Sequence, residues 1–135
     1  MSALQLICLV KCKNQADQYA KENGEKDGTR INAEKHALWN ALMTYSLGLD
    51  LASKIATAHE EELVYLGVSK DLHVGISNEM HMYMDELNNA IGRQIAMDNP
   101  SVATCEELID IIQGTALYYF VWNDQSGAYV LDFGL

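Results

Sequence analysis

Polar and ionisable side chains interrupt three stretches of this chain whose apolar residues otherwise have helical spacing. The interruptions are residues 35–40, His59 with Glu60, and residues 84–93. Burying such groups is costly unless each one finds a hydrogen-bonding partner. The chain is therefore constrained to pack these helices so that their polar groups meet, and a functional site is one reason to build such an arrangement.

Apolar residues recur every three or four positions along most of the chain, which predicts five helices. Asn32 is the expected N-cap of the second helix, and Thr104 with Glu107 matches a capping box at the start of the fifth. The expected helices span about residues 3–22, 32–47, 50–67, 78–97 and 104–117, with a loop at 69–77.

The last part of the chain changes from helical spacing to aromatic and β-branched residues. Tyr118 to Trp122 and residues 128–131 are strand-like, with a polar turn between them, so we expect a β-hairpin over about 118–131. A chain of 135 residues is expected to form one domain, 1–135, with its motif-bearing core at about 31–97. The predicted fold class is mainly α, a single-domain bundle of about five helices with a short C-terminal β-hairpin.

Acidic residues outnumber basic ones by 19 to 9, for a formal net charge of -10. This excess disfavours binding to nucleic acids and to anionic membranes. No apolar run approaches the length of a membrane span, and the first ten residues lack the basic start and the cleavage site of a signal peptide. We therefore expect a soluble chain with no nucleic-acid partner and no stable membrane insertion, which could be delivered as part of a longer secreted protein.

The three cysteines cannot form a closed disulfide framework, because their number is odd. Cys8 and Cys12 are one helical turn apart, and we interpret them as small buried apolar side chains. No Cys/His pair with finger-like spacing accompanies them or Cys105, so no structural zinc site is expected.

The polar groups of the second and fourth helices have spacings that place them on common faces. His36 and Asn40 are four residues apart, and so are Asp85 and Asn89. A glycine inside a helix, such as Gly92, costs about 1 kcal/mol relative to alanine. A neighbouring helix or a ligand is therefore expected to approach Gly92 closely.

One interpretation of these groups is a catalytic cleft between the second, third and fourth helices. Histidine, with an unperturbed pKa of about 6.5, can act as a general acid or base near neutral pH. Carboxylates can orient a histidine, whereas amides and a guanidinium can hold a substrate. The expected catalytic residues are His36, His59, Glu60 and Asp85, and the expected substrate-binding residues are Asn40, Asn88, Asn89 and Arg93.

No cofactor is expected from this pattern, and a divalent metal such as zinc is the alternative. His36, His59 and Asp85 would supply three nitrogen or oxygen ligands and leave one position open, as in catalytic zinc sites. The helical zinc-protease pattern is absent, because no histidine follows His59 by four residues.

The same side chains also fit a purely structural interpretation. A histidine on an apolar helix face can be a satisfied core residue, and aspartate or asparagine can tie helices together or cap a neighbouring helix. His73 and His81, in and beside the expected loop, are predicted to be exposed to solvent.

Three blocks of the chain, at residues 35–41, 59–60 and 84–93, resemble blocks shared by a bacterial domain family of unknown function. The family pattern is R/K-H-A-x-W-N-A, then H-E, then M-D-x-x-N-N-x-x-G, and the blocks occur here in the same order over about residues 31–97. Lys35 stands where arginine is usual. Such domains are often found at the C-termini of polymorphic-toxin-like proteins, so the resemblance implies a toxin context and a site, but no reaction.

The leading functional hypothesis is a small effector or toxin-type hydrolase. Its substrate would be a small molecule or a component of the cell envelope, and its protein partner would be an inhibitor such as an immunity protein. The alternative is a non-catalytic acidic interaction domain, an adaptor or inhibitor, in which the polar groups only stabilise the fold.

Overall fold

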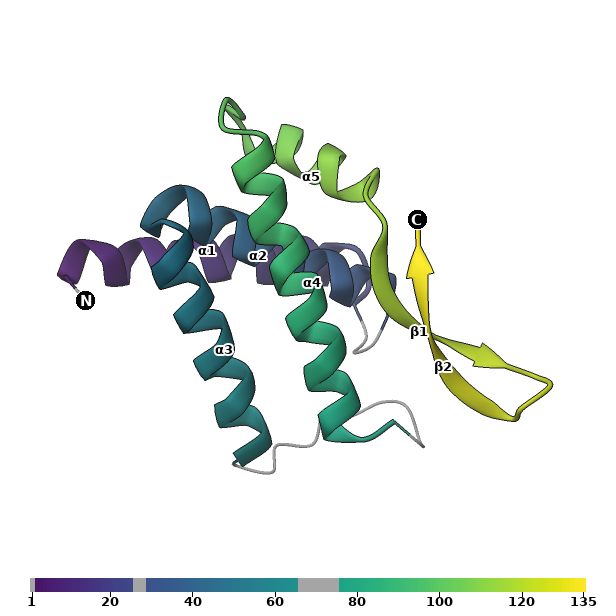
Figure 1. Cartoon of the computed structure of the whole chain (residues 1–135). Helices are drawn as coiled ribbons and strands as arrows, with labels where there is room; N and C mark the ends of the chain where they lie inside the picture. The colour runs from purple at the N-terminus through teal and green to yellow at the C-terminus, as the bar shows by residue number, and fades with distance from the viewer. Residues whose placement is uncertain (1, 26–28, 66–75) are drawn as a thin grey trace.

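The computed structural model describes residues 2–25, 29–65 and 76–135, and within these it has five helices and a two-stranded antiparallel sheet (Figure 1). The prediction of a mainly α bundle with a C-terminal hairpin is confirmed. Residues 66–67 of the third expected helix and 69–75 of the expected loop lie outside the described residues. The elements are α1 (Ala3–Glu22), α2 (Arg30–Leu47), α3 (Leu49–Tyr65), α4 (Asn78–Asp98), α5 (Cys105–Gln113), β1 (Leu117–Asn123) and β2 (Ala128–Gly134).

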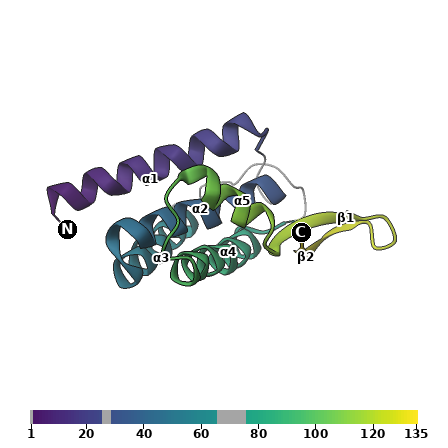
Figure 2. The ribbon, with the colours of Figure 1, turned by 90° about the horizontal axis from the view of Figure 1, so that it is seen from above.

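Helix α2 forms the centre of the structure, because it contacts all four other helices and β1. Figure 2 shows α1 on one side of α2, with α3 and α4 on the other side. Helices α3 and α4 lie side by side and run in opposite directions (Figure 1). Leu38 and Met43 of α2 have no exposed surface, and full burial of such a side chain contributes about 1.5–3 kcal/mol.

Helices α2 and α4 approach each other closely at Gly92. A Cβ atom added to Gly92 would meet the carbonyl oxygen of Ala37 and would lie 2.7 Å from its Cα. Any larger residue would therefore collide with the backbone of α2. The close approach expected at this glycine is explained by a neighbouring helix, which brings the polar faces of α2 and α4 together.

Helix α2 begins earlier than expected. Its N-cap is Thr29, whose hydroxyl accepts a hydrogen bond from the backbone N–H of Asn32 at 3.3 Å. The prediction that Asn32 caps this helix is therefore wrong. Its side chain instead donates to Glu25 at 2.8 Å. Two residue types that both favour caps lie three positions apart here, and spacing alone does not separate them.

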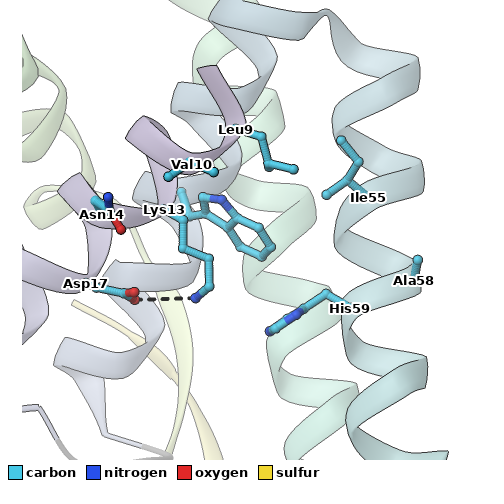
Figure 3. Close-up of a pocket in the computed structure, with 9 residues that line it drawn as sticks. Leu9, Val10, Lys13, Asn14, Asp17, Ile55, Ala58 and His59 are labelled. Carbon is cyan, nitrogen blue, oxygen red and sulfur yellow. Dashed lines mark hydrogen bonds and ion pairs between the residues drawn. The ribbon is translucent and has the colours of Figure 1, made fainter. Parts of the chain in front are cut away.

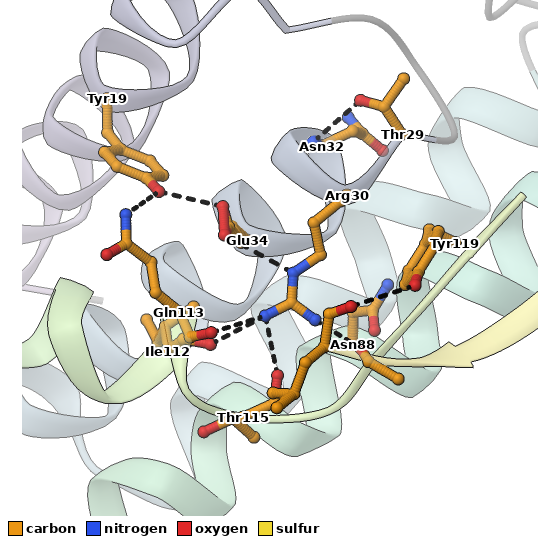
Figure 4. A network of polar contacts seen from close by, with 12 residues as sticks. Tyr19, Thr29, Arg30, Asn32, Glu34, Asn88, Ile112, Gln113, Thr115 and Tyr119 are labelled. Carbon is orange, nitrogen blue, oxygen red and sulfur yellow. Dashed lines mark hydrogen bonds and ion pairs between the residues drawn. The ribbon is translucent and has the colours of Figure 1, made fainter.

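The first residue of α2, Arg30, fastens the end of the chain to the bundle (Figure 4). Its guanidinium donates to the carbonyl oxygens of Ile112 at 3.1 Å, Thr115 at 2.8 Å and Gly134 at 2.6 Å. A cation at the C-terminus of a helix also interacts favourably with the helix dipole. Arg30 therefore joins α2, the end of α5 and the last residue of β2.

The hairpin pairs Leu117 with Gly134 at one end and Asn123 with Ala128 at its turn. Asn88 of α4 attaches this hairpin to the helices: its amide donates to the carbonyl of Tyr118 and accepts from the Tyr118 N–H, both at 2.8 Å. Across the described ranges, none of the helices combines enough length with enough apolar character to traverse a lipid bilayer.

Candidate functional site

Three ionisable side chains from three helices meet in the interior: His36 of α2, Glu60 of α3 and Asp85 of α4. Nε2 of His36 lies 3.3 Å from Asp85 Oδ1, and Nδ1 lies 3.9 Å from Glu60 Oε1. His36 is 7% exposed, Asp85 1% and Glu60 0%. We call His36, Glu60 and Asp85 the triad. His36, Glu60 and Asp85 are part of the group that was expected to converge, whereas His59 and Asn88 make other contacts.

A chain of side-chain hydrogen bonds leads from the protein surface to the triad. Arg93 Nη1 donates to Asn40 Oδ1 at 2.8 Å, and Asn40 Nδ2 donates to Asn89 Oδ1 at 2.8 Å. The same Asn89 oxygen lies 3.2 Å from His36 Nδ1. We call Arg93, Asn40 and Asn89 the orienting chain.

The orienting chain decides which nitrogen of His36 carries hydrogen. A guanidinium only donates, so the Asn40 atom that faces Arg93 must be the amide oxygen. Asn40 therefore donates to Asn89, which turns the amide oxygen of Asn89 toward the imidazole. His36 Nδ1 must then carry a hydrogen to bond with that oxygen. Nε2 faces Asp85 and is left to share a proton, or an ion, with the carboxylate.

A hollow of about 210 Å³ lies beside the orienting chain and is lined by Thr57, Glu86, Asn89 and Arg93. We call it the Arg93 hollow. Asn89 belongs both to this hollow and to the contacts of His36, so it connects the triad with the hollow. Thr57 and Glu86 were not expected at the site, although Thr57 lies one helical turn before Glu60 and Glu86 directly follows Asp85.

Two groups at the Arg93 hollow keep unused hydrogen-bond donors. The Asn89 Nδ2 atom is buried and makes no hydrogen bond to any residue that the structure describes. Arg93 is half-buried and forms no ion pair within the same part of the chain. Burial lowers the pKa of the Arg93 guanidinium, and the charge of Glu86 opposes this shift. A ligand that accepts hydrogen bonds would satisfy both donors.

His59 lies in a different place from the triad. It lines a larger hollow of about 570 Å³ between α1 and α3 and makes an edge contact with the ring of Trp39, with centroids 5.3 Å apart (Figure 3). In the described residues, the His, Cys, Asp and Glu side chains that come close enough to share a metal ion are His36, Glu60 and Asp85. His59 was the predicted third member of a metal-binding set with His36 and Asp85, and the structure has Glu60 in that position instead.

Two further predictions about polar residues change with the structure. Both polar atoms of Asn88 are used by the backbone of Tyr118, so this side chain attaches the hairpin to α4. His81 was expected to be exposed, but it is 1% exposed and packs edge-on to the Phe120 ring at 5.5 Å. That prediction was wrong because it did not foresee that the hairpin covers this side of α4. His73 lies outside the described residues.

A family model described as Domain of unknown function (DUF6973) matches residues 2–117. The chain belongs to this family. The prediction that it is a member of a domain family of unknown function is confirmed. No curated protein and no solved structure matches the chain.

The DUF6973 match contains the triad and the whole orienting chain. It ends at Leu117, the first residue of β1, and so leaves out nearly all of the hairpin. The site therefore belongs to the part of the chain that the family shares.

Proposed function

We propose that this domain is a hydrolase of the effector or toxin type, and that the triad activates the water molecule that attacks the substrate. The observation that carries the proposal is the 3.3 Å approach of His36 Nε2 to Asp85 Oδ1, with Nδ1 held by Asn89. A histidine with one nitrogen held by an orienting group and the other beside a carboxylate forms a pair that can share one proton, and such a pair can serve in general acid–base catalysis.

The Arg93 hollow supplies the second part of the proposed site. The unused N–H of Asn89 and the guanidinium of Arg93 would donate hydrogen bonds to a substrate oxygen, and such donors are most effective where negative charge develops. The triad would remove a proton from water as the water oxygen bonds to the substrate, and would return that proton to the leaving group.

The resemblance stated above supports the toxin context, and the polar groups of the site support the hydrolase assignment. The first test is inducible expression in a bacterial host, both in the cytoplasm and directed to the periplasm. The variants are Asp85→Asn, which keeps the shape of the side chain, and Glu61→Gln as a control at an exposed position beside Glu60. The wild type and Glu61→Gln should arrest growth in one compartment, and Asp85→Asn should not.

The second test identifies the reaction. Purified wild type and Asp85→Asn are incubated with cell-wall sacculi, membrane lipids and small-molecule extracts, and the products are compared by mass spectrometry. Loss of a general acid–base group lowers a rate by about 100-fold to 10,000-fold, so only the wild type should release products. Wild-type protein that is harmless in both compartments and releases nothing would overturn the proposal.

A non-catalytic interaction domain is the second candidate, because α1 leaves apolar side chains uncovered. Leu4 is 70% exposed, Leu6 54%, Ile7 53% and Val10 50%. Apolar side chains grouped on one exposed helix are typical of protein-interaction surfaces. If this surface binds a partner protein, the double substitution Leu4→Ser and Ile7→Ser will abolish co-purification of that partner, and Asp85→Asn will leave co-purification unchanged.

A further inference from the structure

We propose that the triad binds one divalent metal ion, with Zn²⁺ the ion that best fits its donors. His36 Nε2 and one carboxylate oxygen each from Glu60 and Asp85 would be the ligands, and Asn89 would hold the histidine. The proposal rests on the proposed function only for the catalytic meaning of the ion, because binding is measured without a substrate.

The three side chains of the triad lie close together in the interior. One ligand atom from each of the three side chains lies within 4.8 Å of the others. Zinc binds histidine nitrogen and carboxylate oxygen at about 2.0–2.2 Å, so side-chain rotations that draw the three atoms closer together would place them on one ion. The three ligands come from three different helices, and the α2–α4 contact at Gly92 holds two of those helices together.

The orienting chain holds His36 in the way that a metal-binding histidine is usually held. A histidine that binds a metal through one nitrogen nearly always donates its other N–H to an oxygen that fixes the ring. His36 has this arrangement: Nδ1 lies 3.2 Å from Asn89 Oδ1, and Nε2 faces Asp85. Because Arg93 fixes the orientation of Asn40, and Asn40 that of Asn89, the lone pair of Nε2 is directed at the Asp85 carboxylate. The orienting chain is thus independent support that this is a ligand site.

Three protein ligands would leave one coordination position of the ion for water or substrate. Catalytic zinc sites use three protein ligands and keep a fourth position for water or substrate. Asn89 is buried and lines the Arg93 hollow, and its Nδ2 finds no acceptor in the described part of the chain. An oxygen bound to the ion on the side of the hollow would accept this hydrogen bond. A bound zinc ion lowers the pKa of its water to about 7, which would supply the nucleophile for hydrolysis.

The test is titration of the metal-stripped full chain with ZnCl₂ by calorimetry. The wild type should bind one Zn²⁺ per chain. Glu60→Gln and Asp85→Asn, which keep side-chain volume, should abolish this binding event. Asn89→Ala should weaken it by about 10-fold to 100-fold, the usual effect of removing a group that orients a ligand. Glu61→Gln, at the exposed neighbouring position, should bind as the wild type does.

The control for folding is circular dichroism of every variant. If a triad variant does not fold, anomalous diffraction from wild-type crystals soaked in ZnCl₂ decides the matter, because the proposal requires a peak between the three side chains. A wild type that binds no Zn²⁺, equal affinity in wild type and triad variants, or a zinc peak only elsewhere would overturn the proposal.

The outcomes separate this inference from the proposed function. Hydrolysis that persists in metal-stripped, chelator-treated protein would contradict a catalytic role for the metal ion and would leave the hydrolase proposal standing. Tight zinc binding by a protein that is harmless and releases no product would support the metal site and contradict the hydrolase proposal.

Discussion

The amide oxygen of Asn89 lies 3.2 Å from Nδ1 of His36 and also accepts a hydrogen bond from Asn40 at 2.8 Å. Asn89 is 1% exposed. Its one oxygen therefore fixes the ring of a buried histidine, and it does so because a second amide and an arginine fix its own orientation. Through these hydrogen bonds, the buried polar residues hold the His36 ring in one orientation.

Removing the Asn89 amide should weaken the fold as well as the site. Asn89→Ala leaves the donors of His36 and Asn40 without this acceptor, and an unsatisfied buried group costs about 1–3 kcal/mol. Urea denaturation should show a loss of this size. Asn14→Ala, at an exposed position of α1, is the control and should change stability little. An unchanged midpoint in Asn89→Ala would show that the orienting chain contributes nothing.

A side chain at position 92 should separate α2 from α4. Gly92→Ala gains about 1 kcal/mol of helix propensity, but its Cβ would meet the backbone of Ala37, and overpacking of this kind costs about 1–3 kcal/mol. We expect a net loss of stability in thermal denaturation. The opposite change at an exposed position of the same helix, Ala90→Gly, should cost only the propensity difference. A Gly92→Ala protein more stable than the wild type would contradict the close packing of these helices.

Arg30 should hold the hairpin to the bundle. Arg30→Gln removes charge-assisted hydrogen bonds to carbonyls of α5 and β2, each worth about 1.5–3 kcal/mol. Hydrogen exchange should show faster opening of β1 and β2 than of α2 and α4. Arg30→Lys should not rescue the hairpin, because one ammonium cannot reproduce the fork of the guanidinium. Equal exchange rates in wild type and Arg30→Gln would refute this role.

Stability should fall in alkaline solution. Burial raises the pKa of the Cys12 and Cys105 thiols above their ordinary value of 9.0, and raises the pKa of Tyr19 above 10.0. The unfolded chain then releases these protons at lower pH than the folded protein does. The free energy of unfolding is therefore constant with respect to these groups below about pH 9 and decreases as pH rises above it. Urea denaturation from pH 8 to pH 10.5 measures this slope, and a rise in stability over that range would contradict the assignment.

The helices and the hairpin could be predicted because their signals are local. Apolar spacing located α1 and α4 almost to their ends, and the aromatic residues of β1 marked the hairpin. The start of α2 was misplaced because Thr29 and Asn32 both favour caps, and only the backbone shows which one has an extended conformation.

The composition of the site was harder to predict, because it depends on how helices are rotated against each other. His36 and Asp85 were brought together as expected, since each lies on the face that its helix buries. His59 and Glu60 are adjacent in sequence but point to different places, because successive residues of a helix lie about 100° apart around its axis, and the rotation of α3 decides which of them meets His36. The use of Asn88 by the Tyr118 backbone also requires contacts between distant parts of the chain.

The orientation of the His36 ring is the point on which this account of the site depends. Nitrogen-15 NMR of the imidazole groups measures it directly, through long-range couplings that separate Nδ1 from Nε2. In the metal-stripped wild type, we predict a hydrogen on His36 Nδ1 that is protected from exchange and loses this protection in Asn89→Ala. A neutral His36 ring with its hydrogen on Nε2 and a bare Nδ1 would contradict the orienting chain and the site built on it.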